Sequence, residues 1–276
     1  MHEILTVARK EFLEGVRNRW LIGIVIILAL FALGLGYLGA AISGKAGLLP
    51  LDTLIVSLAS LAVFLLPLIA LLLGYDTIIG ERENGTLLLL LSYPLSRSQL
   101  ISGKFLGHLL VLALATVLGF GVAAASIAAL SGNLLDVALW RLFGAFIFSS
   151  ILLGGVFLAL AYLISVTVSE KTHAVALALG LWFFFVLAYD LGLLGLLVFS
   201  HGAIGHDLFP YLLLLNPNDV FRLANFTLVG ASTAYPGMAP IVMQGGFSLP
   251  LLLSTLLGWL VLPFLLALWR FQRAQL

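Results

Sequence analysis

A charged turn followed by a run of leucines contains the residues best suited to bind another protein. The turn is Gly80-Glu81-Arg82-Glu83-Asn84-Gly85-Thr86, and the leucines occupy positions 87–91. Gly85 permits a tight backbone turn, and Asn84 or Thr86 can cap a short helix over residues 87–93. Pro94 discourages that helix from continuing, so the element should be short.

A short leucine-faced helix between charges suits docking in the groove of a partner protein. An ordinary interfacial loop is the alternative, but such a loop needs no capped helix with a leucine face. Ser96 and Gln99 have the spacing of a capping box, which predicts a new helix that runs through Lys104. We therefore expect residues 80–103 to form a hairpin that binds a partner, called the charged hairpin below.

Two aspartates within apolar stretches could line a substrate path. A charge at the bilayer centre costs about 2.5–3.5 kcal/mol on insertion scales, so it is rarely kept without a function. Asp76 lies near the end of its stretch, where solvent or Arg82 can reach it, and is interpreted as an interfacial anchor. Asp190 either faces a translocation path or, if its helix breaks near Gly192, lies at the outer interface.

A third group of residues could contact a metal or a partner. It comprises His201, His206, Asp207, Met238 and Met243. Thioether and imidazole ligands suit Cu(I). Such spacings are common by chance, so docking of a periplasmic partner is the favoured interpretation of this group.

Several kinds of chemistry are excluded. The chain has no cysteine and no His-Glu-x-x-His, and Gly103-Lys104 lacks the first glycine and the hydroxyl of a phosphate-binding loop. We therefore expect no enzyme, no resident metal and no cofactor in this chain, and any nucleotide must be bound by another chain. A secondary transporter would need several intramembrane ionisable residues, and Asp190 is the one fair candidate.

Composition identifies an integral membrane protein of the all-α class. Hydrophobic residues make up 62%, charged residues 9%, and the mean hydropathy is +1.20. Six apolar stretches reach the roughly 20 residues that a spanning helix needs. They are residues 20–42, 54–79, 104–130, 142–168, 173–199 and 249–269. Ten basic residues precede or follow these stretches on one side and three on the other, which predicts cytoplasmic termini.

The segments outside the spans have their own patterns. Apolar residues recur at helical spacing over residues 1–19, with Lys10, Glu11 and Glu14 opposite, which predicts an amphipathic helix on the inner membrane surface. Residues 200–248 form an outer loop, in which Asn216-Pro217-x-Asp219 predicts the start of a short helix through Ala224. Residues 208–215 are too short to span.

The charged hairpin resembles that of the type-2 ABC exporter permeases, in which a coupling helix of the pattern Glu-Arg-Glu-x-Gly-Thr-Leu joins the second and third spans. The start at residues 8–12 and Leu215-Asn216-Pro217 are also similar to this family, so the resemblance covers residues 1–276 as a single transmembrane domain. It implies a homodimer that carries two separate ATPase subunits, which bind ATP and Mg. The residues implied in coupling are Glu81, Arg82, Glu83, Gly85, Thr86, Leu87, Leu88, Leu91 and Pro94.

More narrowly, residues 17–20 and 70–76 resemble the permeases whose transporter helps to mature the copper sites of nitrous oxide reductase. This implies a bacterial inner-membrane location, a sulfur-containing cargo and a periplasmic accessory protein. Export of a drug, a lipid or copper is the alternative. In this family the first and fifth spans form the dimer seam, where Gly34, Gly36 and Gly39 or Gly192 and Gly195 could allow close approach; packing within one chain would need small residues just as much.

Overall fold

The protein is described by a computed structural model that covers residues 2–42, 49–130, 132, 134–199, 209–230 and 247–274. The regular structure of these residues is helical, and six helices or helix combinations are long and apolar enough to cross a membrane. This confirms the predicted all-α class and the six spans.

The helices follow one another from the N-terminus to the C-terminus with short connections. They are α1 His2–Arg17, α2 Arg19–Ile42, α3 Leu51–Gly74, α4 Ile79–Glu83, α5 Thr86–Leu91, α6 Arg97–Leu130, α7 Val137–Thr167, α8 Lys171–Phe183, the π-helix η1 Phe184–Ala188, α9 Tyr189–Phe199, α10 Phe209–Leu213, α11 Pro217–Val229 and α13 Leu249–Arg273.

Helix α7 forms the centre of the bundle. Its apolar window is 78% buried, whereas that of the combined α8, η1 and α9 is 17% buried. Helices α3, α6, α11 and α13 pack around α7, and α2 packs on α6. Close packing depends on glycines, since a Cβ at Gly154 would lie 2.5 Å from Leu112 and one at Gly155 would lie 2.7 Å from Leu260. Small residues of this kind let membrane helices approach each other.

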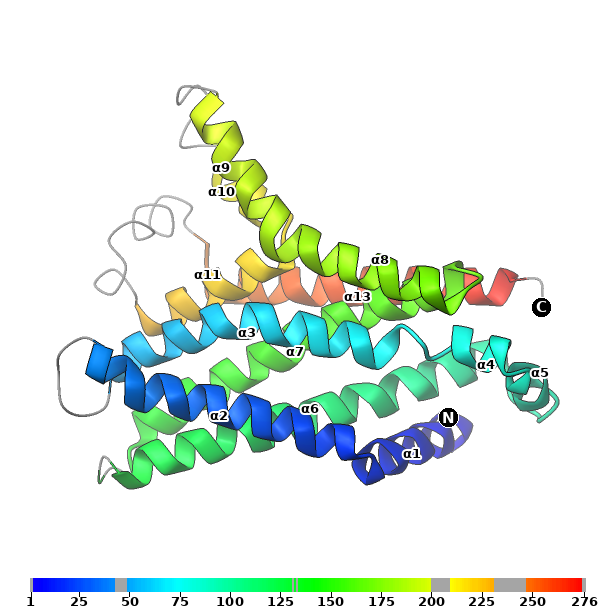
Figure 1. The fold of residues 1–276 in the computed structure, drawn as a ribbon, viewed down its shortest axis with the longest axis horizontal. Helices are drawn as coiled ribbons and strands as arrows, with labels where there is room; N and C mark the ends of the chain where they lie inside the picture. The colour runs from blue at the N-terminus through cyan, green and yellow to red at the C-terminus, as the bar shows by residue number, and fades with distance from the viewer. Residues whose placement is uncertain are drawn as a thin grey trace.

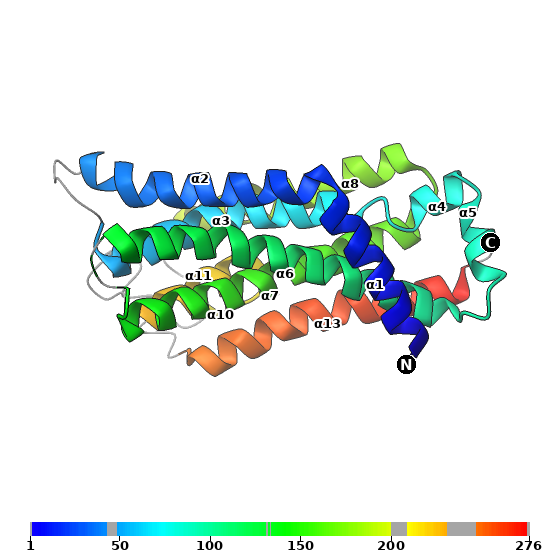
Figure 2. The same ribbon diagram turned by 90° about the horizontal axis from the view of Figure 1, so that it is seen from below.

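The bundle is elongated, and its two ends differ. Both termini lie at the same end as α4 and α5, while the α2–α3 and α6–α7 connections lie at the opposite end (Figures 1 and 2). Beyond η1, helix α9 bends away from the bundle, and α10 returns beside it (Figure 1). The charged hairpin and the α9–α11 region are therefore separate parts of the molecule.

The second span ends earlier than the predicted Ile79. Helix α3 stops at Gly74, where a Cβ would lie 2.7 Å from Ala161. After a turn, the backbone amides of Ile78 and Ile79 donate to the hydroxyl of Ser165 on α7, at 3.0 and 3.2 Å. This side-chain acceptor satisfies two amides at the start of α4, so a separate helix begins there.

Two expectations about the outer half are also corrected. The fifth span does not break near Gly192, because α9 is helical from Tyr189 to Phe199; the irregular segment is η1, which precedes Asp190. The helix that starts at Asn216 does not end at Ala224. Asn216 caps it as predicted, but it continues to Val229 and ends where Gly230 adopts a positive φ of 68°.

Helix α1 packs on α6 and crosses it obliquely (Figure 2). Glu11, which periodicity placed on the polar side, is 7% exposed, whereas the apolar Leu5 is 60% exposed. The expected assignment of the two faces is therefore wrong for Glu11, and the contact with α6 explains why. A Cβ at Gly103 would lie 2.9 Å from the carbonyl oxygen of Ile4, so the two backbones are in close contact.

The glycines proposed for a dimer seam have different surroundings. Gly36 packs within the chain, since a Cβ there would lie 3.2 Å from Ile127 of α6. Gly34, Gly192 and Gly195 have nothing within 4 Å of a Cβ position. The surroundings of Gly39 lie outside the part of the chain that the structure describes. Space for a second copy therefore exists beside α9 and one side of α2.

Replacement of Gly107 by valine should detach α1 from α6. A Cβ at Gly107 would lie 2.8 Å from the carbonyl oxygen of Ala8 and 2.6 Å from the Cβ of Glu11, whereas Gly121 on the same helix has open space. Overpacking of this kind costs about 1–3 kcal/mol. In detergent, Gly107→Val should lower the free energy of unfolding by that amount relative to Gly121→Val, and equal stability of the two variants would contradict the packing.

Candidate functional site at the charged hairpin

The charged hairpin consists of α4, a glycine turn, α5 and the first two turns of α6. Gly85 has a φ of 72°, a conformation that favours glycine. Neither Asn84 nor Thr86 caps α5, as expected from the sequence; the N-cap is Gly85, and the Thr86 hydroxyl donates to the Glu81 carbonyl at 3.2 Å and contacts its carboxylate. The hydroxyl thus closes the turn internally.

The exit from α5 follows the prediction more closely. Helix α5 ends at Leu91, two residues before the expected end and ahead of Pro94. The capping box is confirmed, because the Ser96 amide donates to the Gln99 side chain at 2.8 Å and the Gln99 amide donates to the Ser96 hydroxyl at 3.2 Å. Helix α6 therefore starts at a fixed position directly after the hairpin turn.

The leucines of α5 divide into an inner and an outer set. Leu87 is 2% exposed and belongs to the hydrophobic core, so it anchors α5 and is not available for docking. This corrects the expectation for Leu87. Leu88 and Leu89 are 65% and 64% exposed, and Tyr93 is 58% exposed. Leu89 and Tyr93 were not predicted as docking residues, because five consecutive leucines carry no information about which of them point outward.

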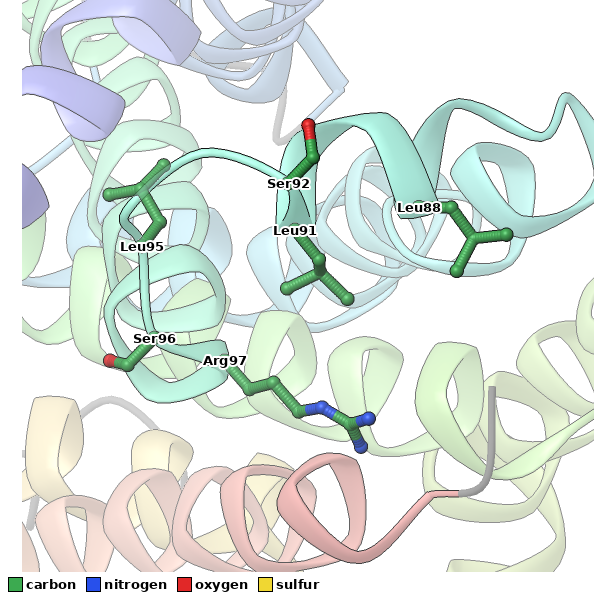
Figure 3. Close-up of a pocket in the computed structure, with 6 residues that line it drawn as sticks. All are labelled: Leu88, Leu91, Ser92, Leu95, Ser96 and Arg97. Carbon is green, nitrogen blue, oxygen red and sulfur yellow. The ribbon is translucent and has the colours of Figure 1, made fainter.

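A pocket of about 510 Å³ lies between α5 and the start of α6. Leu88, Leu91, Ser92, Leu95, Ser96 and Arg97 line it (Figure 3). Its wall combines leucine side chains with hydroxyl groups and one guanidinium. An apolar side chain of a partner could enter it while a polar neighbour binds its rim.

Arg97 joins the hairpin to the last helix of the chain. Its Nη1 donates to the carbonyl oxygens of Phe271 at 3.2 Å, Gln272 at 3.3 Å and Ala274 at 2.6 Å. These carbonyls lie at the C-terminal end of α13, where helices have unsatisfied acceptors and a partial negative charge. The guanidinium therefore fixes the end of α13 against the start of α6.

Lys104 joins the hairpin to α1. Its ammonium nitrogen lies 2.9 Å from Glu11 Oε1 and 3.1 Å from Glu81 Oε1. Lys104 is 4% exposed, so its charge is compensated by these two carboxylates rather than by bulk water. The basic-residue pattern presents Lys104 as a charge that orients the protein in the membrane, and it does not predict this contact.

The polar contacts continue from Glu11 into the bundle. Glu11 Oε2 lies 3.7 Å from His108 Nε2, and His108 Nδ1 lies 2.8 Å from the hydroxyl oxygen of Tyr162. Tyr162 belongs to the central α7 and is fully buried. A continuous set of contacts thus links the hairpin, α1 and α6 to the core.

The other charged residues of the turn bind the start of α8 and the end of α7. Glu83 Oε1 accepts from the Lys171 amide at 2.7 Å, and Arg82 Nη1 lies 3.4 Å from the Val168 carbonyl oxygen. Asp76 pairs with the Lys171 ammonium at 2.6 Å, not with Arg82. The charges of the turn therefore hold the hairpin in position, and the exposed leucines are left for a partner.

The remaining predicted site residues are not part of this site. Asp190 lies in the α9–α11 region and pairs with Arg222 at 2.8 Å. His201, His206, Asp207, Met238 and Met243 lie outside the described residues. In the part of the chain that the structure covers, no group of three or more His, Asp or Glu side chains is arranged to hold a metal ion.

Removal of the Lys104 charge should strongly destabilise the protein. Lys104→Ala leaves two carboxylates without their buried cation, and loss of one partner of a buried pair costs about 3–5 kcal/mol. The matched control is Lys10→Ala, because the Lys10–Glu14 pair at 3.3 Å is more than half exposed on both sides. An exposed pair contributes about 0–1 kcal/mol. Denaturant unfolding in detergent measures both variants, and a similar cost for the two would refute a buried ion pair.

The same contact predicts a loss of stability in acid. Burial acts to raise the pKa of Glu11, but the Lys104 ammonium more than offsets this, so the pKa lies below its ordinary value. The stabilisation is therefore fully present above the unfolded pKa of about 4.3 and is lost as pH falls through the folded value. Glu11→Gln should be less stable than wild type at neutral pH, and this difference should shrink in acid. A constant difference between pH about 3 and 7 would contradict the prediction.

Comparison with known proteins agrees with the geometry. The family described as "ABC-2 family transporter protein" matches residues 5–276. The chain is 51% identical over 278 residues to the "Probable ABC transporter permease protein NosY" of Stutzerimonas stutzeri, with 99% of each chain covered. It is 52% identical over 269 residues to a protein of the same name from Pseudomonas aeruginosa, with 98% of this chain and 94% of that protein covered. The chain therefore belongs to the ABC-2 family and is a multi-pass permease subunit of an ABC transporter.

Proposed function

We propose that the charged hairpin is the docking point for a separate ATPase subunit, which drives transport through this permease. The observation that carries this proposal is the combination of exposed Leu88 and Leu89 with a hairpin that is fixed to the bundle on several sides. Apolar anchors on a rigid support are what a protein interface requires, because little ordering entropy is lost when they bind.

The contacts also suggest how ATP hydrolysis reaches the membrane helices. A push on α5 would reach α1 through Lys104, α13 through Arg97 and α8 through Glu83. Rigid-body movement of one such unit against another is a common means of transmission. Two copies of the chain, each holding one ATPase with its ATP and Mg, would complete the transporter; the exposed sides of α2 and α9 offer the seam.

We further propose that the hairpin end of the bundle faces the cytoplasm of a bacterium and that the protein lies in the inner membrane. Basic residues are concentrated at this end, among them Arg17, Arg82, Lys171 and Arg270. The positive-inside rule favours this orientation. Residues 200–248 would then face the periplasm, where an accessory protein could bind them.

The proposed cargo is a sulfur-containing species used to mature the copper centres of nitrous oxide reductase. This rests on the narrower resemblance at residues 17–20 and 70–76 and on the NosY name of the two relatives. The chain has no cysteine, so it would pass sulfur without a covalent intermediate. Export of copper, a lipid or a drug by the same permease is the alternative.

Replacement of the two exposed leucines tests the docking site. Leu88→Ser combined with Leu89→Ser should weaken binding of the ATPase by about 2 kcal/mol or more, which is roughly 30-fold in Kd. The control is Leu135→Ser at the opposite end of the bundle, where the leucine is 93% exposed. Affinity measured in detergent, with thermal unfolding to verify the fold, distinguishes them. Unchanged affinity in the double variant would remove the hairpin as the docking site.

A transport assay tests the cargo. The permease and its ATPase would be reconstituted in inside-out vesicles with ATP and either a sulfur-labelled small thiol or Cu(I). Accumulation of labelled sulfur that disappears with a catalytically inactive ATPase is the expected result. Accumulation of copper alone would favour the alternative cargo and would leave the docking proposal intact, because that proposal is tested by affinity.

A further inference from the structure

Two carboxylates lie side by side where α9 meets α11. Arg222 Nη1 is 2.8 Å from Asp190 Oδ2 and 3.1 Å from Asp219 Oδ1. Asn216 Nδ2 is 3.3 Å from Asp190 Oδ1 and 3.0 Å from Asp219 Oδ2. Each of these two nitrogen atoms bridges both carboxylates, so Asp190 and Asp219 face one another. They are called the aspartate pair below.

The hydrogen bonds of this junction are short of one hydrogen. An amide nitrogen carries two hydrogens, yet Asn216 Nδ2 lies within bonding distance of both carboxylates and of the Phe185 carbonyl oxygen at 3.0 Å. Asn218 donates to the same carbonyl at 3.1 Å, and its own Oδ1 is buried without a donor. A hydrogen on one carboxyl group would reduce this shortage, because that group would then donate instead of accept.

The charges lead to the same conclusion. Two ionised carboxylates and one guanidinium give a net charge of −1, and Asp219 is only 5% exposed. Burial of a like-charged pair favours protonation of one member. Burial and the adjacent Asp190 raise the pKa of Asp219 to about 7, although Arg222 acts to lower it.

Other ionisable groups on the packed elements are few. Tyr189 on α9 is the nearest, and its hydroxyl donates to the Leu212 carbonyl at 2.7 Å. Helices α3, α7 and α13 pack against α11. Their ionisable residues are Asp52, Arg141, Tyr162, Arg270 and Arg273. The charged groups with the largest effect on Asp219 are Asp190 and Arg222.

We propose that the aspartate pair is a proton-binding site, which holds one hydrogen ion between its two carboxyl groups and pairs the remaining negative charge with Arg222. Uptake adds one proton from solvent to a carboxylate oxygen and changes the net charge of the cluster from −1 to 0. The site lies beside η1, at the point where α9 leaves the bundle. Protonation therefore strengthens the contact of α9 with α11, and loss of the proton weakens it.

Infrared spectroscopy of the purified full-length chain tests the proposal. As the pH is lowered from about 9 to 5, wild type should gain the carbonyl-stretch band of a protonated carboxylic acid, while exposed acids stay ionised. The midpoint should lie near 7. Both Asp219→Asn and Asp190→Asn should remove the band, because the single remaining carboxylate pairs with Arg222. Arg222→Gln should move the midpoint upward, and Asp52→Asn is the control that should change nothing.

The variants distinguish a proton shared by two carboxyl groups from a proton held by one buried acid. A band that is lost in Asp219→Asn but kept in Asp190→Asn would mean that Asp219 binds the proton alone, and the proposal would be wrong. Absence of any band in wild type would overturn it as well. If Asp219→Asn does not fold, Asp190→Asn and Arg222→Gln decide the question, because a shared proton requires opposite responses from these two variants.

Discussion

The charged hairpin depends on one buried cation. The Lys104 ammonium has little contact with solvent and is stabilised by carboxylates from two other elements, Glu11 of α1 and Glu81 of α4. A buried ammonium without such partners would be strongly unfavourable. The three elements must therefore come together for any of them to be stable in this arrangement, and the position of the hairpin follows from this requirement.

The charged turn has a division of labour that its composition does not reveal. In an exposed turn, Glu81, Arg82 and Glu83 would be free to bind a partner. Here each of them binds another part of the same chain, while two neutral leucines are left in solvent. A rigid element loses less entropy when it binds, so internal contacts of the charged residues can serve an interface to which they contribute no direct bond.

Local and repetitive features of the fold could be predicted from the sequence. The six spans follow from apolar length, and the Asn216 cap and the Ser96–Gln99 capping box follow from contacts within four residues. The burial of Glu11 could not be predicted in this way, because it depends on a lysine far along the chain. Gly103 and Gly107, which flank Lys104, were the available signal for a close helix contact at that position.

The same distinction explains the other errors. Five successive leucines give no helical phase, so the inward direction of Leu87 is decided by the core. The π-helix η1 depends on Asn216 and Asn218, whose side chains bind the Phe185 carbonyl from α11. A π-helix leaves backbone carbonyls without their usual partners, and these distant amides supply the donors. The predicted break near Gly192 was wrong because glycine content alone does not show where such donors lie.

The capping of α13 by Arg97 has a practical consequence for work with this protein. The Ala274 carbonyl that accepts from Arg97 lies close to the C-terminus, and Arg97 also lines the pocket beside α5. An affinity tag or a fluorescent fusion at the C-terminus would begin next to the surface proposed to receive the ATPase. A tag inserted in the α6–α7 connection, at the opposite end of the bundle, would avoid this interference (Figure 1).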